Sequence, residues 1–425
     1  MSDPAKGTAL ESRSGRATLP AMKVALFHPE FNAPRGAENL VLTFAEALQR
    51  EKQEVRLVAF GWDEQRMGSR LAPFNPRPVP APRIAWNGAP DAQTLTALRE
   101  ALAGCDLAMA SNHPSNAYLG LCGGSARTLW YCHEPHRSLF AREANPAMTA
   151  ALAAGRLEQE GTLAKAIAGA LRRSRWKRLL SPRHRGRIAL DRAGVARLDA
   201  VWANSAATAR AVESIYGRAA EVFYPAVELV TELPPPAVWE RPLRVLVMGG
   251  LGAYKGLQGL LQGMALFLRD HPGAAVLEIV GKGRELPDLK RIAASLGLGA
   301  AAQFHGFLPD PELAELKLRC HGFAAMPGDE PFGLVFAEAA GAGLVLIGPD
   351  HGGPREIMDD GRSGILADPF DSASIAKALA RFSSLPQEQR EGLRAAAFDS
   401  ARARFAVADL GGRLVDRLDR LLTRA

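Results

Sequence analysis

A repeated order of strand, glycine-bearing turn and helix restricts this chain to few folds. An apolar strand at 23–28 leads through a loop at 29–36 into an amphipathic helix at 38–50. The order starts again with a strand at 243–248, a glycine-rich turn and a helix at 256–269. Strands that are apolar throughout are typical of parallel sheets covered by helices on both faces. The sequence therefore predicts an α/β fold of two Rossmann-like domains, in which ligands bind in the cleft where the strands end.

Proline-rich stretches divide the chain. The linker 233–242 separates a first domain at 22–232 from a second at 243–400. Residues 1–21 are small and polar and are predicted to be a disordered N-terminal extension. Residues 401–425 carry leucines at helical spacing and are predicted to form an amphipathic helix. A second proline-rich stretch, Pro73 to Pro82, is predicted to be a loop.

Cysteine usage and hydropathy narrow the class of protein. The 425 residues include four cysteines, none in a Cys-x-x-Cys pair, which disfavours disulfide-rich and structural zinc folds. A reducing compartment is then the default. No apolar run reaches the roughly 18 residues needed to cross a membrane, and the N-terminus lacks the apolar core of a signal peptide. We therefore expect a cytoplasmic protein.

The net charge of +7 comes from one segment. Residues 172–197 hold ten Lys or Arg and one acidic residue, so the rest of the chain is slightly acidic. Leucines and a tryptophan alternate with these cations, which favours a helix lying on an anionic membrane surface. A solvated helix and a nucleic-acid contact are the alternatives. The candidate membrane-contacting residues are Arg172, Arg173, Arg175, Trp176, Lys177 and Arg178.

The turn 249–256 is the first stretch with chemical character. Its glycines, Gly252 among them, let the backbone approach a phosphate closely, and the following helix presents unpaired N–H groups. Lys255 adds a full positive charge beside them. The spacing matches neither the Walker A loop nor the dinucleotide-binding motif. The turn is a candidate phosphate site, with an ordinary strand-to-helix turn as the alternative.

Two glutamates frame a second candidate stretch. Glu330 precedes a predicted helix, and Glu338 lies two turns into that helix among apolar residues. The first turn, Gly333 to Val335, would direct its N–H groups into the cleft. A buried carboxylate is costly unless it is hydrogen-bonded, and vicinal hydroxyls such as those of a ribose supply such bonds. Internal pairing of Glu338 is the structural alternative.

Two more stretches follow predicted strands. His133 comes after the strand 128–131, where its side chain would face the cleft, and a structural histidine is the alternative. The segment from His351 to Ile357 follows the strand 344–347 and contains two adjacent glycines. It predicts either another close approach to a ligand or a plain turn.

The order of these stretches resembles family 4 of the retaining GT-B glycosyltransferases, which use nucleotide-sugar donors. Glu330 and Glu338, eight positions apart with Pro-Phe-Gly-Leu-Val-Phe-Ala between them, are similar to the two-glutamate signature of that family. The resemblance runs from residue 22 to the C-terminus, and its matches in the first half are looser. Those further matches are Arg35-Gly-Ala-Glu38, Ala203-Asn-Ser205, Tyr224-Pro225, Ile279-Val-Gly-Lys-Gly283, Phe304-His-Gly-Phe-Leu308, Gly352-Gly353 with Glu356-Ile357, Asp360-Gly361 and Gly364-Ile-Leu366.

The resemblance implies a donor site in the second domain and a last helix that crosses back to the first. Glu338 would hold the ribose hydroxyls, and 304–308 would line the base. Backbone N–H groups at 333–335 would bind the diphosphate while the first loop closes over it. Such enzymes usually need no divalent metal, and no cofactor or metal is expected here. The implied donor-binding residues are Gly36, Arg35, Gly252, Phe304, Gly333, Leu334, Val335 and Glu338.

Three residues are implied to be catalytic. Lys255 would neutralise the leaving β-phosphate, which is the main electrostatic task of the transition state. Glu330 and His133 would lie at the donor sugar. No pair of residues looks like a nucleophile with a separate base, which favours a front-face route in which the departing phosphate oxygen takes the acceptor proton. The expected reaction moves a hexose, with mannose as one candidate, from a GDP- or UDP-linked donor. The expected acceptor is a glycan or glycolipid at the cytoplasmic membrane face.

One departure from the family pattern keeps alternatives open. Gly250 stands where the family usually has an arginine, five residues before Lys255, so one phosphate-binding cation is missing. Arg35 is a candidate substitute from across the cleft. A non-catalytic protein that binds nucleotide-sugars or anionic surfaces is the main alternative. An epimerase or phosphorylase-like enzyme of the same fold, and a basic nucleic-acid binder, are weaker alternatives.

Overall fold

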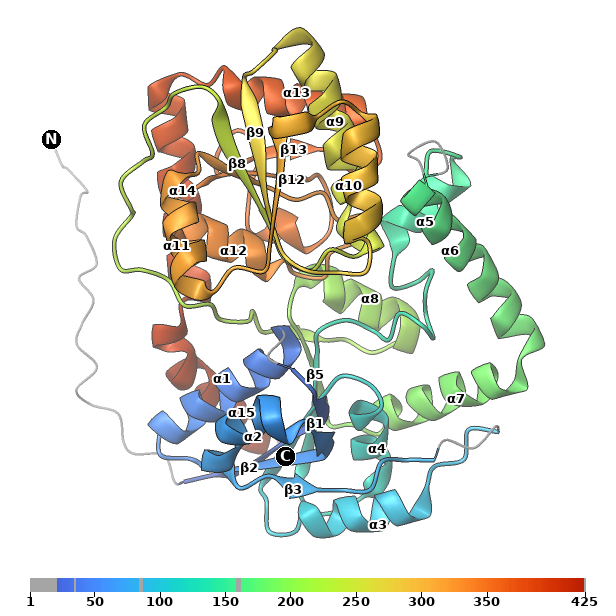
Figure 1. Cartoon of the computed structure of the whole chain (residues 1–425). Coiled ribbons are helices and arrows are strands. Elements are labelled where there is room, and N and C mark those ends of the chain that lie inside the picture. The colour runs from blue at the N-terminus through green and yellow to red at the C-terminus, as the bar shows by residue number, and fades with distance from the viewer. Residues whose placement is uncertain (1–20, 34–35, 84–86, 158–161, 424–425) are drawn as a thin grey trace, which may run out of the picture.

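The computed structural model describes residues 21–33, 36–83, 87–157 and 162–423, which form two α/β domains, one above the other in Figure 1. The sheet of the first domain has seven parallel strands in the order β3-β2-β1-β4-β5-β6-β7. Among its interior strands, β4 is buried along its whole length and β5 over its last four residues, as expected for strands covered on both faces. These strands are β1 (Lys23–Phe31), β2 (Glu54–Trp62), β3 (Arg77–Pro78), β4 (Leu107–Ser111), β5 (Arg127–Cys132), β6 (Ala200–Ala203) and β7 (Glu221–Val222).

The second domain repeats the plan with six parallel strands in the order β10-β9-β8-β11-β12-β13. β8 lies beside β11, with Val245 opposite Gly322, so the segments that follow these two strands emerge next to each other. That edge faces the first domain. The strands are β8 (Leu243–Met248), β9 (Ala275–Val280), β10 (Ala302–Gly306), β11 (Gly322–Ala324), β12 (Val345–Pro349) and β13 (Ile365–Ala367).

Helices cover both faces of each sheet. In the first domain α1, α2 and α15 cover one face, and α3, α4 and α7 cover the other. In the second, α9, α10 and α13 lie opposite α11, α12 and α14. The helices of the first domain are α1 (Gly36–Arg50), α2 (Glu64–Leu71), α3 (Ala92–Ala101), α4 (Ser115–Cys122), α5 (Pro146–Ala153), α6 (Thr162–Leu180), α7 (Pro182–Ala196) and α8 (Ala206–Tyr216). Those that follow are α9 (Leu257–Asp270), α10 (Leu286–Ser295), α11 (Asp310–Arg319), α12 (Leu334–Gly341), α13 (Ser372–Ser383), α14 (Gln387–Phe405) and α15 (Leu410–Thr423).

The last helix belongs to the core of the first domain. After α14 the chain crosses between the domains, and Ala406 forms a bridge with Val227. The buried side chains of α15 (Leu410, Leu414 and Leu418) then pack with α1 and the first sheet. The two-domain Rossmann-like GT-B architecture predicted from the sequence is therefore confirmed.

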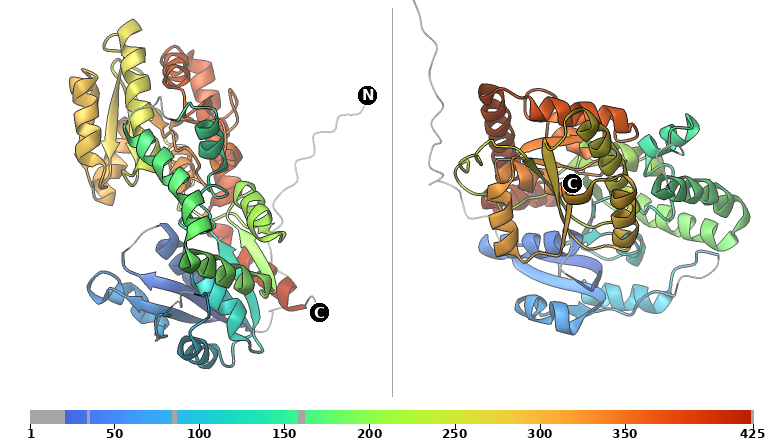
Figure 2. Two further views of the ribbon diagram at one scale, coloured as in Figure 1. Left: turned by 90° about the vertical axis from the view of Figure 1, so that its right-hand side faces the viewer. Right: turned by 45° about the horizontal axis from the view of Figure 1, so that its top comes forward.

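Helices α5 and α6 form an arm that reaches from the first domain to the second. They are inserted between β5 and β6, yet α5 lies beside the second domain in Figure 1, and α6 returns to α7 of the first. In the left view of Figure 2, α6 crosses in front of the junction between the domains. We call the described part of residues 146–180 the α5–α6 arm. None of the described helices combines the length and hydropathy needed to span a bilayer.

Two predicted boundaries differ from the structure. The stretch 73–82 was predicted to be a loop, but it contains β3, whose Pro78 pairs with Ala59 of β2. Proline is tolerated there because β3 is the edge strand and needs no second row of hydrogen bonds. The second domain also continues past residue 400, because α14 runs on to Phe405. The predicted extension at 1–21 lies almost entirely outside the described residues.

Candidate functional site

A cavity of about 460 Å³ lies between the two domains, where the strand ends of both sheets meet. It brings together residues that are far apart in the sequence. Most of the predicted catalytic and diphosphate-binding residues that the structure describes face it. The residues lining this interdomain cavity are Gly36, Ala37, Leu40, Asn112, His133, Glu134, Arg137, Asn204, Pro225, Lys255, Glu330, Pro331, Phe332, Gly333, Leu334 and Val335.

Lys255 and Glu330 form an ion pair in this cavity. The Nζ of Lys255 lies 2.7 Å from Oε2 of Glu330, and the carboxylate is the more buried partner. Lys255 ends the short helix η2 (Ala253–Lys255) after β8, and Glu330 follows β11, the neighbouring strand. The pair holds a cation at the place where the sequence predicts a phosphate. A bound diphosphate would share this cation with Glu330.

Helix α12 points its N-terminus at the same place. Gly333 precedes the helix with φ of +95°, and a Cβ there would lie 2.9 Å from the ring of Phe336. Only glycine fits this conformation without strain. The backbone N–H groups of Leu334 and Val335 have no partner within the helix, and they carry its positive dipole end. With Lys255 they make a site suited to a diphosphate.

Glu338 lies one turn inside α12, nearer the helix start than the two turns predicted. Its side chain is largely surrounded by protein, and this burial raises the pKa of the carboxyl, while the positive charge of Lys317 opposes the shift. A carboxylate held in this way gains from a ligand that donates hydrogen bonds. Its predicted role as the ribose ligand stays a prediction.

A smaller cavity of about 100 Å³ lies behind Lys255, between the turn after β8 and α12. Gly250 lines it, and a Cβ built on Gly250 meets no atom within 4 Å. Sterics therefore do not explain the glycine found where the family usually has an arginine. Gly252 lies on the same turn, directly before η2.

The first loop reaches this region through Gly36. Gly36 is the first residue of α1, and a Cβ built on it would lie 3.8 Å from the side chain of Leu334 in the second domain. Gly36 therefore lies beside the N-terminal end of α12, and its role in closing over a phosphate stays a prediction. Arg35, the candidate substitute for the missing arginine, lies outside the described residues.

Phe304 takes a different position from the other predicted donor residues. It lies on β10 and packs against the hydrophobic core of the second domain, below the Nζ of Lys290. It does not line the two cavities described above. The base-lining role of 304–308 therefore stays a prediction.

A hydrogen-bonded chain of buried side chains leads to His133. The Nδ1 of His28 lies 3.2 Å from Oγ of Ser111, and this oxygen lies 2.8 Å from Nε2 of His133. His28 lies within β1, Ser111 ends β4 and His133 follows β5, and these three strands are neighbours in the sheet. Burial lowers the pKa of His133 to about 4 and that of His28 to about 3. His133 is thus a neutral hydrogen-bonding group at neutral pH, oriented by Ser111.

These histidines predict acid-sensitive stability. His28, His133 and His136 have folded-state pKa values of about 3, 4 and 4, below their ordinary value near 6.5. Below pH 6.5 the unfolded chain binds protons that the folded chain does not, so stability falls as the pH drops towards 4. Each histidine contributes up to about 1.4 kcal/mol per pH unit. Urea denaturation at pH 7.5, 6 and 5 measures this loss.

Two matched variants separate the effect of the buried histidines from other causes of lower stability in acid. His136→Gln should make the pH dependence shallower, while the exposed His271→Gln should leave it unchanged. If the free energy of unfolding depended on pH equally in the wild type and both variants, His136 would not be a cause of the acid sensitivity.

Glu356 joins the two domains, a role that its sequence did not reveal. Its carboxylate accepts hydrogen bonds from the backbone N–H groups of Ala206 and Ala207, at 2.8 and 3.0 Å, at the start of α8. The hydroxyl of Tyr224 adds a third at 3.0 Å. Ser205 also donates to the carbonyl of Pro331 at 2.6 Å. Glu356 therefore serves the domain interface, whereas Gly352 and Gly353 pack against the backbone of residues 330–332 in their own domain.

Two family models match this chain, one for each domain. Residues 34–230 match the model described as Glycosyltransferase Family 4, and residues 232–399 match Glycosyl transferases group 1. Together they span most of the described chain.

Curated relatives match a part of the chain. A D-inositol 3-phosphate glycosyltransferase of Thermomonospora curvata is 34% identical over 166 residues, which are 37% of this chain and 38% of the relative. A glycogen synthase of Mycobacterium tuberculosis is 32% identical over 155 residues, 36% of this chain and 37% of the relative. The matched segments thus span less than two fifths of these relatives.

Solved structures show the same fold at low identity. HepE of Anabaena, in complex with UDP and glucose, has a TM-score of 0.67 and 18% identity, covering 94% of this chain and all of that one. A sucrose-phosphate synthase of Thermosynechococcus elongatus has a TM-score of 0.67 and 15% identity, covering 95% of this chain and all of that one.

Proposed function

Because the chain belongs to family 4 of the GT-B glycosyltransferases, we propose that it transfers a hexosyl group from a nucleotide-diphosphate sugar to a glycan or lipid-linked acceptor. The observation that carries the proposal is the pairing of Lys255 with Glu330 beside the N-terminus of α12, inside the interdomain cavity. These groups suit a leaving diphosphate and a sugar next to it. The HepE structure with UDP and glucose supports a donor of this class.

The site supports a front-face reaction with retention. Lys255 and the N–H groups of Leu334 and Val335 stabilise the charge that develops on the leaving diphosphate. The departing phosphate oxygen takes the proton of the acceptor hydroxyl, which attacks from the same face of the sugar. Neutral His133 holds a sugar hydroxyl, and Glu330 binds the sugar on the other side. In this proposal no covalent glycosyl-enzyme forms, and no cofactor or metal takes part.

The nucleotide is identified by ligand stabilisation followed by turnover. Thermal unfolding is measured with UDP, GDP and ADP, and release of the stabilising nucleotide from its glucose and mannose derivatives is then followed. A rise in unfolding temperature together with release supports the transferase. Stabilisation without release by any of these donors would favour the second candidate, a non-catalytic nucleotide-sugar binder, for which Gly250 is the argument. Salt-sensitive duplex binding without any nucleotide response would favour a nucleic-acid protein.

The basic end of α6 is our candidate for contact with the cytoplasmic membrane surface. The side chains of Trp176 and Leu180 are 60% and 73% exposed, and Lys177 lies between them on the helix. Figure 1 shows this end of α6 projecting from the molecule where it turns into α7. Exposed apolar groups among cations suit the interface of an anionic bilayer. Arg172 and Arg173 are exposed on the same helix.

Changing these exposed groups should release the protein from anionic vesicles. The triple variant Trp176→Glu, Lys177→Glu and Leu180→Glu loses both apolar contact and charge attraction. We therefore expect its partitioning onto phosphatidylserine vesicles to fall at least tenfold, which corresponds to about the binding free energy of one or two such side chains. Donor hydrolysis should persist, because these residues do not line the cavity. Lys377→Glu, an exposed cation on α13, is the control. Unchanged sedimentation with vesicles would remove the membrane role.

A further inference from the structure

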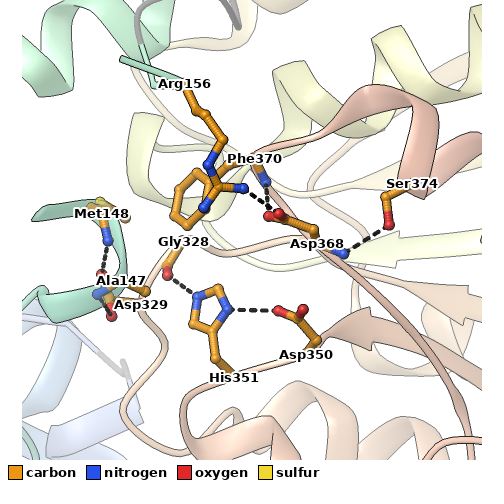
Figure 3. A network of polar contacts seen from close by, with 10 residues as sticks. All are labelled: Ala147, Met148, Arg156, Gly328, Asp329, Asp350, His351, Asp368, Phe370 and Ser374. Atoms are coloured by element: carbon orange, nitrogen blue, oxygen red, sulfur yellow. Dashed lines mark hydrogen bonds and ion pairs between the residues drawn. The ribbon is translucent and has the colours of Figure 1, made fainter. Parts of the chain in front are cut away.

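The α5–α6 arm is tied to the segment that carries Glu330. Asp329 is 8% exposed, and its two carboxylate oxygens accept hydrogen bonds from the backbone N–H groups of Ala147 and Met148, at 3.1 and 2.8 Å. Figure 3 shows Asp329 facing these two groups at the start of α5. Burial raises the pKa of Asp329, whereas these two bonds and the charges of His351 and Arg137 favour its ionised form. The carboxylate therefore depends on the arm for its partners.

Close packing holds the same segment under the arm. A Cβ built on Gly328 would lie 2.4 Å from Cε of Met148 and 3.0 Å from the ring of Phe370. The carbonyl of Gly328 is also hydrogen-bonded by Nε2 of His351, whose ring stacks on Phe370 at a centroid distance of 5.7 Å (Figure 3). A side chain at position 328 would displace the side chain of Met148 and crowd the ring of Phe370. The packing at Gly328 thus ties this segment to the arm.

The arm also contacts the segment that carries Lys255. Helix α6 packs against η2, and Ala253 and Tyr254 of η2 join an apolar cluster that includes Met148, Leu171 and Phe370. Arg137 of the first domain lies 5.2 Å from the centre of the Tyr254 ring and donates to the carbonyl of Asp329 at 3.0 Å. Tyr254, which precedes Lys255, and Asp329, which precedes Glu330, therefore both contact the arm.

An ion pair fixes the far side of the arm. The guanidinium of Arg156 pairs with the carboxylate of Asp368, which also accepts from the backbone N–H of Phe370 at 2.9 Å (Figure 3). Partly exposed pairs of this kind contribute little alone. Here the pair sets the arm against the loop that carries Phe370.

We propose that the docked α5–α6 arm positions the Lys255–Glu330 pair, with Asp329 as the positioning residue that couples arm and donor site. This inference rests on the proposed function and extends it. The first domain would then contribute to donor use through an element that does not itself line the interdomain cavity. Undocking would leave the fold of both domains intact and move Glu330 away from Lys255. Moving Glu330 away from Lys255 should lower the rate of donor turnover, because catalysis needs both charged groups in their places.

Kinetics of variants on both sides of the contact test the coupling. Asp329→Asn removes the charge and leaves one oxygen for two N–H donors, and Met148→Ala removes packing without touching the cavity. Each should lower kcat/KM for donor hydrolysis about tenfold or more, with a smaller change in the affinity for the free nucleoside diphosphate. In the double variant kcat/KM should fall no further than in the more impaired of the two single variants, since both substitutions break the same contact. Asp371→Asn, which removes a carboxylate cap from α13 of the same domain, is the matched control and should keep wild-type kinetics.

Hydrogen exchange gives a readout that does not need turnover. In the intact protein, Met148→Ala and the milder Arg156→Ala should speed amide exchange in α5 and also in residues 328–336. Faster exchange in α5 with unchanged exchange at 328–336 and unchanged kinetics would overturn the proposal. If the wild type hydrolyses no donor, the proposed function fails, whereas the exchange result still decides whether the arm holds the segment. If Asp329→Asn lowered the stability of the whole protein but kept wild-type kinetics, Asp329 would have only a structural role, and this result would also overturn the proposal.

Discussion

Replacing Lys255 with alanine is expected to lower the rate of donor turnover by about 10²-fold or more, the usual effect of removing one preorganised charge from a transition state. The effect should appear mainly in kcat, because Lys255 acts on charge that develops as the phosphate leaves. Its Nζ lies 2.7 Å from Glu330, so the variant also leaves that carboxylate without its partner. Single-turnover rates of nucleotide release from saturating donor measure the loss.

Two further variants test whether the charge itself matters. Lys255→Arg should recover part of the activity, and Lys377→Ala, which removes an exposed cation from α13, should have no effect. Gly250→Arg places a second cation at a position where a Cβ meets no atom within 4 Å, so it should tighten donor binding. A Lys255→Ala enzyme with wild-type kcat would remove Lys255 from the reaction. It would also weaken the front-face scheme, in which the leaving phosphate must be stabilised.

Glu338→Ala is expected to raise the KM for the donor about 10- to 100-fold, the range for losing one hydrogen bond to a charged group. The carboxylate lies in α12 in surroundings that raise its pKa, so hydrogen bonds donated by a ribose would be strong. Titration of the nucleoside diphosphate by calorimetry measures the loss directly, because the sugar is not needed for this contact.

Controls for Glu338 separate binding from folding. Glu338→Gln keeps the shape of the side chain and should show most of the loss, whereas Glu315→Ala, an exposed carboxylate on the adjacent helix α11, should bind as the wild type does. Unchanged nucleotide affinity in Glu338→Ala would place the ribose elsewhere. Loss of affinity together with an equal loss in stability would point to internal pairing instead.

Local patterns predicted the parts of this molecule that local forces determine. The strand 243–248 was predicted with the bounds found in the structure, since all its residues except Arg244 are apolar and buried. Lys255 and Glu330 were predicted to share a site, and they meet because β8 and β11 are neighbours. The edge strand β3 was missed, because a pattern of prolines favours a loop unless the neighbouring strand is known.

Contacts between distant segments could not be read from the sequence. His28 lies within an apolar strand, and only the strand order brings it through Ser111 to His133. Asp329 has no signal of its own, because its partners Ala147 and Met148 donate through the backbone and leave no mark in residue identity. The Ala-rich segment around α5 carries no sequence signal either, although it lies against the segments that hold Lys255 and Glu330.

The position of α15 sets the order in which the two domains can mature during synthesis. The first domain ends its sheet at Val222, but its core needs the leucines of α15, which are synthesised only after the whole second domain. Until then the face of α1 that α15 covers is exposed, while the second domain already has all its strands and helices. The domain made first is therefore completed last, and a nascent or shortened chain would present an unfinished first domain to chaperones and proteases.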